Sequence, residues 1–449
     1  MRLTDAIRLQ RGDRVALVGA GGKTSAMFRL ADELRREGWR VVTTTTTHVA
    51  LEQLEALPEV IWLSGTQDIS PVLQALDRSG VAMVVGPSTE ARARVGGPPP
   101  EVLDALASRL DVDAILIEAD GSRQLPLKAP AEHEPAIPEF ADLVVVVVGY
   151  RGLGQPLDAD HVHRPERFSV LAGMSLGAPV SAEAVARVLS HREGGLRRVP
   201  PGARAVALIN QIDREADLEG SRRLARQVLA EPGMGRVAIA SMRREDPVWE
   251  VHGRVGGVIL AAGASSRLGQ PKALLPWKGI TVIGQVVAAA SAMGLDDVVV
   301  VAGEHVDAIG EAVGRQARVV YNREWALGQS RSVCLGLSVL RADVAAALFM
   351  LGDQPGIDPA VGRQVIERWR QTGSPIVAPR YRGQRGHPVL FDRCVFPELM
   401  ALEGDVGGRL VIERHVEHVA WVDIDGPSPP DIDTWEGYQR ALTGGDRVD

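Results

Sequence analysis

Short apolar runs alternate with longer amphipathic segments along almost the whole chain, which predicts βα units and a mainly parallel sheet. The run at 142–149 has no polar alternation, as is typical of a strand buried on both faces. The segment at 25–38 has helical spacing and ends at Gly38, so we expect a helix there. The strands expected in this first series are 14–19, 39–45, 81–86, 113–120, 142–149 and 203–210.

A second series of apolar runs follows the polar stretch at 241–254. A chain of 449 residues is long enough for two hydrophobic cores. We therefore predict an α/β protein with two tandem three-layer domains, residues 1–245 and 255–449, joined by a linker at 246–254. The strands expected in the second series are 256–263, 295–303, 317–322, 345–353 and 374–379.

The charge and cysteine content of the chain limit the partners and the cellular compartment that we expect. The 50 Lys and Arg residues are outnumbered by 57 Asp and Glu residues, which gives a net charge of −7. We therefore expect neither a nucleic-acid partner nor an anionic membrane surface. The two cysteines, Cys334 and Cys394, give no disulfide framework, which suits a reducing cytosol. No run reaches the roughly 18 apolar residues of a membrane span, so we expect a soluble, cytoplasmic protein.

The stretch GGVILAAGASSRLGQPKALLPWKG, residues 256–279, joins an apolar strand to a loop of small residues. Ligands of open α/β sheets bind at the carboxyl ends of the strands, which is where this loop begins. Small residues from Ala262 to Ser266 let backbone N–H groups turn toward phosphate oxygens. Arg267 and Lys272 supply the positive charge that a triphosphate needs. The loop taken alone also fits a surface turn with two solvated cations.

Acidic residues follow later strands of the same series. Asp353 comes directly after a buried run in LFMLGDQP, where a carboxylate is costly unless it meets a cation. Mg²⁺ usually takes one or two carboxylates together with substrate phosphates, so we expect Asp353 to bind Mg²⁺. Asp431 and Asp433 in DIDTWEGY are candidates for a second ligand. The polar, glycine-containing turns at 385–391 and 403–409 are typical of pocket walls.

Five motifs occur in order: LAAGxSxRxGxPKxLLP, GDQP, GHPVLF, GDVGGR and DIDT. Over residues 255–445 this set resembles the molybdenum cofactor nucleotidyltransferases, and most closely their MocA-like cytidylyltransferase branch. The resemblance implies a Rossmann-like mixed sheet and transfer of CMP from CTP to molybdopterin-bound molybdenum, with release of pyrophosphate. LAAG followed by PK resembles the cytidine enzymes, whereas the guanosine branch carries LAGG and a DK-type ending. The resemblance also implies Mg²⁺ and a molybdenum hydroxylase apo-enzyme as the recipient of the cofactor.

The resemblance assigns roles to individual residues. It makes Arg267, Lys272 and Asp353 the catalytic groups, and Asp353 and Asp433 the metal ligands. The remaining residues expected to bind nucleotide or pterin are Ala261, Ala262, Gly263, Gly328, Ser330, Ser332, Gly386, His387, Asp405 and Arg409.

Two other functions fit the same motifs. The protein could act as a nucleotide-gated carrier that hands molybdopterin to an apo-hydroxylase, with little release of pyrophosphate. It could also transfer nucleotidyl groups to another phosphorylated acceptor such as a sugar phosphate, because the first loop and the GDxP pattern are widely shared.

A glycine turn also follows the first strand of the chain, in VALVGAGGKTSAMF. Gly21 and Gly22 precede Lys23 and Thr24 at the expected helix start, where N–H groups and the helix dipole favour an anion. A strict Walker A motif would place glycine where Leu17 stands, so a plain strand–helix turn is the alternative. We expect ATP or GTP at this loop, with hydrolysis left open.

Two later strand ends support a nucleotide site in the first half. EADGS ends a strand with Glu118 and Asp120, and Asp120 is the expected Walker B-type acid. LINQID, residues 208–213, resembles the NKxD base-reading element with Gln211 in place of lysine, although a chance strand end fits equally well.

The motifs GAGGKT, TTTTTH, EADGS, LPLKAP and VHRPE together resemble the YqeC-like proteins over roughly residues 5–245. That family is associated with maturation of selenium-dependent molybdenum hydroxylases. The resemblance implies a nucleotide-binding accessory role.

Overall fold

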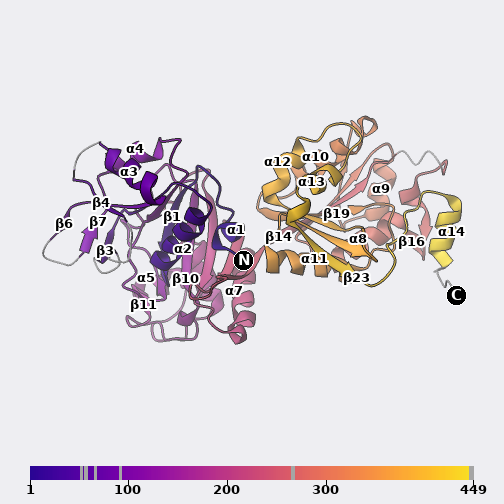
Figure 1. Ribbon diagram of the computed structural model, residues 1–449. Helices are drawn as coiled ribbons and strands as arrows, with labels where there is room; N and C mark the ends of the chain where they lie inside the picture. The colour runs from indigo at the N-terminus through magenta and orange to yellow at the C-terminus, as the bar shows by residue number, and fades with distance from the viewer. Residues whose placement is uncertain (51–53, 55–58, 65–67, 90–93, 264–267, 444–449) are drawn as a thin grey trace. The chain divides into compact units, whose positions relative to one another are not determined.

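The computed structural model describes residues 1–50, 54, 59–64, 68–89, 94–263 and 268–443. Its contacts divide the chain into two compact units, Met1–His252 and Gly253–Asp449, and each unit combines strands and helices (Figure 1). The α/β class predicted from the sequence is therefore confirmed. Among the helices that the structure describes, none combines the length and the apolar character needed to cross a bilayer.

The division between the two units falls inside the linker expected at 246–254, but most of that segment is a strand. That strand is β14 (Val248–Ala261). Ten consecutive residues of this strand, from Glu250 to Ile259, are buried, and its last two residues are partly exposed. The charged residues that suggested a solvent-exposed linker are buried with partners. Glu250 pairs with His252 at 2.9 Å, and Arg254 pairs with Asp343 at 3.0 Å.

In the main sheet of unit 1, eight of the described strands pair in parallel with one another. Their order is β13, β12, β10, β1, β8, β2, β5, β4, and β10 is buried along its whole length, as its unbroken apolar sequence predicts. These strands are β1 (Arg14–Gly19), β2 (Val41–Thr45), β4 (Val60–Trp62), β5 (Val81–Val85), β8 (Ala114–Glu118), β10 (Leu143–Gly149), β12 (Arg204–Asn210) and β13 (Arg236–Ala240). Short strands outside this sheet are β3 (His48–Ala50), β6 (Ser88–Thr89), β7 (Arg94–Gly96), β9 (Leu127–Lys128) and β11 (Val162–His163).

Each face of this sheet has its own core. Val15 and Leu17 of β1 belong to a cluster with residues of α1 and α2, whereas Ala16 and Val18 belong to a cluster with α5, α6 and α7. Alternate side chains of a strand point to opposite faces, so unit 1 has a helical layer on each side of the sheet. The helices of unit 1 are α1 (Leu3–Ile7), α2 (Lys23–Arg36), α3 (Ser70–Ser79), α4 (Pro100–Ala107), α5 (Pro165–Ala172), α6 (Ala182–Ser190) and α7 (Leu218–Ala230).

The sheet of unit 2 is mixed. Its order is β18, β17, β14, β19, β22, β20, β23, and β22 runs antiparallel to both β19 and β20 while the other pairs in this order are parallel. The strands are β17 (Asp297–Ala302), β18 (Arg318–Tyr321), β19 (Val344–Leu351), β20 (Ile376–Tyr381), β22 (Val389–Asp392) and β23 (Val419–Ile424), with β15 (Pro276–Trp277), β16 (Ile280–Thr281) and β21 (Gln384–Arg385) as short additions. The helices are α8 (Val282–Ala292), α9 (Val306–Val313), α10 (Gln329–Val339), α11 (Pro359–Thr372), α12 (Phe396–Met400), α13 (Arg409–Arg414) and α14 (Trp435–Thr443).

Strand register brings three loops to one edge of this sheet. Leu260 pairs with Leu351, and Ala261 pairs with Ala302, so the central parallel strands β14, β19 and β17 end at the same level. The segments that follow these strands therefore start side by side, where ligands of open α/β sheets bind.

Trp369 of α11 is an anchor of the second core. Its side chain is fully buried, and its Nε1 donates to Asp392 Oδ2 at 2.9 Å. We predict that Trp369→Ala lowers the free energy of unfolding of unit 2 by about 3–5 kcal/mol, because it leaves a large cavity and removes one hydrogen bond from the buried Asp392 carboxylate. Trp435→Ala, which removes a 43% exposed side chain, should cost less than about 1 kcal/mol. Urea denaturation followed by circular dichroism measures both, and equal losses would contradict the prediction.

Candidate active site

A cleft of about 560 Å³ lies at the carboxyl edge of the unit 2 sheet. Its walls come from the segments that follow β14, β17 and β19, together with the start of α10. A cavity of this size is typical of a small-ligand site. The residues expected from the sequence that line it are Ala261, Ala262, Gly263, Lys272, Gly328, Ser332, Asp353 and Asp405.

Lys272 and Asp353, which lie 81 positions apart in the sequence, meet at this cleft. The Lys272 Nζ donates to Asp353 Oδ2 at 2.6 Å and to Asp433 Oδ1 at 2.9 Å. Partial burial opposes the charged form of the lysine, but the two carboxylates outweigh it and raise the pKa of Lys272. The ammonium group therefore stays charged and holds the two acidic side chains together.

A third aspartate stands beside this cluster. Asp431 Oδ1 accepts a hydrogen bond from Gln354 Nε2 at 2.6 Å. Loss of solvent around the Asp431 carboxyl, together with the negative charges of Asp353 and Asp433, raises its pKa. Gln354, which follows Asp353 directly, was not predicted, although the GDQP motif contains it. Its contact favours a positioning role for Asp431, with Asp433 as the carboxylate that faces the lysine.

A second cavity of about 640 Å³ lies next to the first. The two share Leu260, Gln329, Leu351 and Asp405 in their walls. The second cavity also contains Arg385, His387 and Arg409. Burial and the neighbouring Arg385 lower the pKa of His387 to about 4, so its imidazole is neutral near pH 7. Two ligands could therefore be held side by side, with a basic wall around the second.

The start of α10 forms part of the wall between the cavities. Gln329 N donates to Asp405 Oδ1 at 3.1 Å, which ties the helix start to the GDVGGR turn. A Cβ on Gly328 would lie 2.5 Å from the Gly404 carbonyl oxygen, so only glycine allows this close approach. The first N–H groups of the helix are therefore already bonded within the protein, because Ser330 N also donates to the Gly404 carbonyl oxygen at 3.4 Å.

Ser330, Ser332 and Gly386 have structural surroundings that the sequence did not reveal. Ser330 is fully buried and donates to the Gly404 carbonyl oxygen at 2.7 Å, and it lines neither cavity. Ser332 lines the first cavity, but its hydroxyl accepts from Asn322 Nδ2 at 2.9 Å. Gly386 lines neither cavity and packs against the ring of Tyr381. Arg267 lies outside the described residues.

The acidic pair fits a divalent cation. Asp353 and Asp433 already converge on one cation, the Lys272 ammonium, and carboxylate oxygens are the ligands that Mg²⁺ prefers. Among the described residues there is no cluster of three or more His, Cys, Asp or Glu side chains that could hold a metal ion. Other ligands would then come from phosphate oxygens and water, which is how Mg²⁺ is usually bound at nucleotide sites.

The glycine loop of unit 1 connects β1 to α2. Gly19, Gly21 and Gly22 all have positive φ, and a Cβ on Gly21 would lie 2.2 Å from the Gly149 nitrogen. Gly19 N donates to both Asp120 carboxylate oxygens, at 3.1 and 3.0 Å, and Gly21 N donates to Leu125 O at 3.1 Å. An anion at the start of α2 would therefore rely on the N–H groups after Gly21, which differs from a loop wrapped entirely around phosphate.

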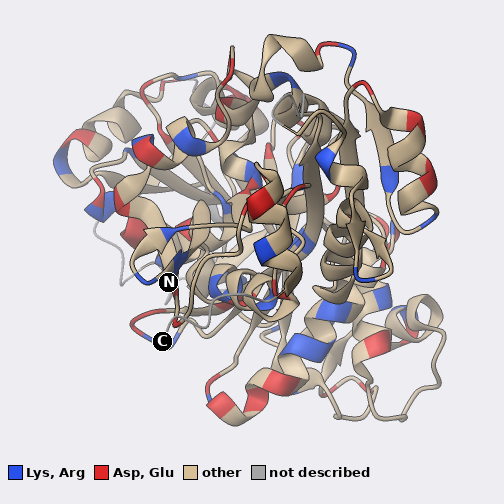
Figure 2. Cartoon of the chain, turned by 90° about the vertical axis from the view of Figure 1, so that its right-hand side faces the viewer, with Lys and Arg blue, Asp and Glu red and all other residues tan. Residues whose placement is uncertain are grey.

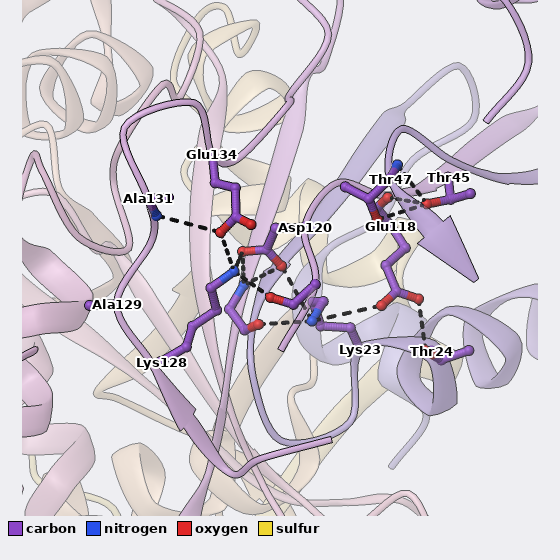
Figure 3. A network of polar contacts seen from close by, with 12 residues as sticks. Lys23, Thr24, Thr45, Thr47, Glu118, Asp120, Lys128, Ala129, Ala131 and Glu134 are labelled. Carbon is purple, nitrogen blue, oxygen red and sulfur yellow. Dashed lines mark hydrogen bonds and ion pairs between the residues drawn. The ribbon is translucent and has the colours of Figure 1, made fainter. Parts of the chain in front are cut away.

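Lys23 and Asp120 are the centre of a buried ionic network (Figure 3). The Lys23 Nζ donates to Gly19 O at 2.8 Å and lies 3.3 Å from Asp120 Oδ1, and each side chain is only 2% exposed. Thr24 Oγ1 donates to Glu118 Oε2 at 2.7 Å. Burial raises the pKa of Glu118 against the opposing effects of Lys23 and Thr24. The expected residues thus lie together, but their charges are matched within the protein.

The network extends to residues that were not predicted individually. Lys128 Nζ donates to Asp120 Oδ2 and to Glu134 Oε2, both at 2.8 Å, and Arg164 clamps Glu134 with bonds of 2.8 and 2.9 Å. Lys128 lies in LPLKAP and Arg164 in VHRPE, two of the motifs that carry the family resemblance. No sequence signal joined these segments to Glu134.

Glu134 should make stability depend on pH. Burial opposes its charged form, but Arg164 and Lys128 outweigh it and lower the pKa of Glu134 to about 2, against about 4.3 in an unfolded chain. Because the folded pKa is lower, the stabilisation is present above about pH 4.3 and is lost as pH falls through 2. We predict that Glu134→Gln costs about 2 kcal/mol at pH 7, because it breaks a largely buried ion pair. Urea titrations between pH 7 and pH 2.5 should show this difference shrink toward acid. A constant difference would contradict it.

Sequence comparison assigns the two units to two families. The YqeC protein family matches residues 15–166, and the MobA-like NTP transferase domain matches residues 257–419. A protein of Escherichia coli (strain K12) described as "Uncharacterized protein YqeC" is 37% identical over 199 residues, which cover 44% of this chain and 75% of the relative. The chain joins a YqeC domain to a MobA-like NTP transferase domain.

The MobA-like domain has relatives of different chemistry. The nicotine blue oxidoreductase of Paenarthrobacter nicotinovorans is 33% identical, over 42% of this chain and 96% of the relative. The molybdenum cofactor cytidylyltransferase of Escherichia coli (strain K12) is 25% identical, over 30% of this chain and 69% of the relative. A crystal structure of Rv0371c from Mycobacterium tuberculosis H37Rv has 35% identity, covers 42% of this chain and 98% of its own, and gives a TM-score of 0.39.

Proposed function

We propose that the MobA-like domain transfers CMP from CTP to the molybdopterin form of the molybdenum cofactor and releases pyrophosphate. The observation that carries the proposal is the convergence of Lys272, Asp353 and Asp433 beside two adjacent cavities. One cavity is of a size for the nucleotide, and the basic wall of the other suits a phosphorylated acceptor.

The chemistry needs charge compensation more than proton transfer. A phosphate acceptor is already a nucleophile near pH 7, so the barrier comes from bringing two anions together and from charge on the leaving pyrophosphate. Mg²⁺ held by Asp353 and Asp433 would supply a Lewis acid for the phosphate oxygens. Lys272 binds the same phosphates and offsets their negative charge. The neutral His387 in the second cavity donates or accepts a hydrogen bond without adding charge.

One relative of this domain is described as an oxidoreductase, which makes redox chemistry the alternative to nucleotidyl transfer. The ionic cluster of this chain favours nucleotidyl transfer, because hydride transfer has no need for a lysine between two carboxylates. CTP is proposed as the donor because Ala262 and Pro271–Lys272 stand where the cytidine branch carries the same residues.

For the YqeC domain we propose binding of a nucleoside triphosphate at the loop of residues 19–24. The positive φ of Gly21 and Gly22 and the position of Lys23 and Thr24 at the start of α2 support it. The domain would then act as a nucleotide-dependent accessory in delivering the cofactor to a molybdenum hydroxylase.

Pyrophosphate release from each NTP tests the transferase proposal. The full chain is incubated with Mg²⁺ and the molybdopterin cofactor, and inorganic pyrophosphate is measured apart from phosphate, which an NTPase would release instead. We expect release with CTP that requires the cofactor. Activity with GTP alone would overturn the choice of base, and release with a sugar phosphate would favour the other nucleotidyltransferase function. Stoichiometric cofactor binding without pyrophosphate would favour the carrier.

A further inference from the structure

The LINQID segment contacts the glycine loop of unit 1 directly. Asn210 ends β12, is 4% exposed, and donates from Nδ2 to the Gly21 carbonyl oxygen at 2.8 Å. Its Oδ1 accepts from Met242 N at 3.2 Å. Asn210 therefore joins three segments that leave the carboxyl ends of β1, β12 and β13, which is the edge where α/β sheets bind ligands.

Asp213 stands three residues beyond this contact. Its Oδ1 accepts from Ser241 Oγ at 2.6 Å, and the Arg151 guanidinium bonds its other oxygen while Arg243 lies 3.7 Å away. Three residues of chain reach at most about 11 Å, so this carboxylate lies within a nucleoside's length of the loop. The hydrogen bond from Ser241 and the nearby arginines lower the pKa of Asp213, which keeps the group an acceptor only.

We propose that Asp213 reads a guanine base, so that the nucleotide bound by unit 1 is a guanine nucleotide. The inference rests on the proposed nucleotide binding at residues 19–24. Guanine presents two adjacent N–H donors, on N1 and on the 2-amino group, and a carboxylate accepts both. Adenine turns the lone pair of its N1 toward the same carboxylate and is repelled.

The surroundings of Asp213 suit this role. Ser241 fixes the carboxylate through one oxygen and leaves lone pairs available for a base, since an ionised carboxylate has about four acceptor sites. Arg151 is 53% exposed, and surface ion pairs of this kind contribute little, so a base displaces it at small cost. Asn210 places the base-reading segment against the same loop that holds the phosphates.

Asp213→Asn tests the inference through a change of specificity. The variant amide offers one donor, which matches the 2-oxo group of xanthine and opposes the 2-amino group of guanine. Isothermal titration of the full chain with GDP, ADP and xanthosine diphosphate, each with Mg²⁺, measures the three affinities. We expect the original protein to bind GDP at least about 100-fold more tightly than ADP, and the variant to lose about 100-fold in GDP affinity while gaining xanthosine diphosphate.

Asp217→Asn is the matched control. Asp217 is half-buried four residues further along and pairs with the exposed Arg214 at 2.9 Å, so the control removes the same charge without changing Asp213. It should keep the preference for GDP. Equal affinity of the original protein for GDP and ADP, or an unchanged preference in Asp213→Asn, would overturn guanine recognition while nucleotide binding stands. Absence of binding for every nucleotide would overturn the nucleotide site as well.

Discussion

Lys272→Ala should lower the rate of pyrophosphate release from CTP at least about 100-fold, the scale typical for loss of one preorganised electrostatic group. The side chain bridges Asp353 and Asp433 at 2.6 and 2.9 Å, so it stands where the triphosphate and its cation are proposed to meet. Its loss removes positive charge from the phosphates when charge builds on the leaving group. Steady-state kinetics with CTP, Mg²⁺ and the cofactor measure the effect.

Lys278→Ala is the control for this experiment. Lys278 lies six residues further along and is exposed, and its Nζ lies 5.6 Å from the centroid of the Trp277 ring. It should keep turnover within about twofold of the original protein, since exposed surface changes have small effects. Near-normal turnover in Lys272→Ala would remove the lysine from the mechanism.

Asp353→Asn should lower turnover by about 100- to 1,000-fold and weaken the binding of Mn²⁺, used as a probe for Mg²⁺. The substitution keeps the shape of the side chain but removes the charge that a divalent cation needs. Electron paramagnetic resonance of free Mn²⁺ reports the binding without turnover, so the metal role is separated from other effects on the rate.

Asp307→Asn provides the comparison for Asp353→Asn. Asp307 is exposed on α9, in the same unit, and lies outside the cleft. It should leave both Mn²⁺ binding and turnover near their original values. Unchanged Mn²⁺ binding in Asp353→Asn would contradict a metal role for this aspartate.

The strands of both units follow closely from the hydrophobic pattern. The run at 142–149 becomes β10 (Leu143–Gly149), and the run at 14–19 is β1 with the same bounds. An uninterrupted run of Val, Ile and Leu has no polar side chains on either face of the strand, so it can be recognised from the sequence as a strand buried on both faces. Figure 2 shows stretches coloured for acidic and for basic residues interspersed along the ribbon.

The pattern fails where tertiary pairing hides polar residues. The first half of β14 carries Glu250, His252 and Arg254, which in isolation are typical of a surface linker. Each of them is buried with a charged partner. Glu250 and His252 pair with each other along the strand, and Arg254 pairs with Asp343, which is distant in the sequence. Strands β13, β22 and β23 were also missed, because apolar runs of only four to six residues give weak signals.

Residues of the candidate site could be predicted from the sequence where a single motif contains the residue and indicates its role. Lys272 and Asp353 lie in conspicuous loops that follow strands, and the register of β14 and β19 brings them together. Glu134 and Arg164 were not predictable, since their pairing depends on segments 30 residues apart with no shared pattern. Ser330 was assigned to a ligand, whereas its buried hydroxyl bonds the Gly404 carbonyl oxygen.

The most direct test is the position of Mn²⁺ in a crystal of the full chain with a non-hydrolysable analogue of CTP. Anomalous scattering locates the ion independently of the protein coordinates. The account predicts a peak between the carboxylates of Asp353 and Asp433, with the Lys272 ammonium shifted onto the phosphates. A peak elsewhere, or Lys272 still bridging both aspartates with the nucleotide bound, would contradict it.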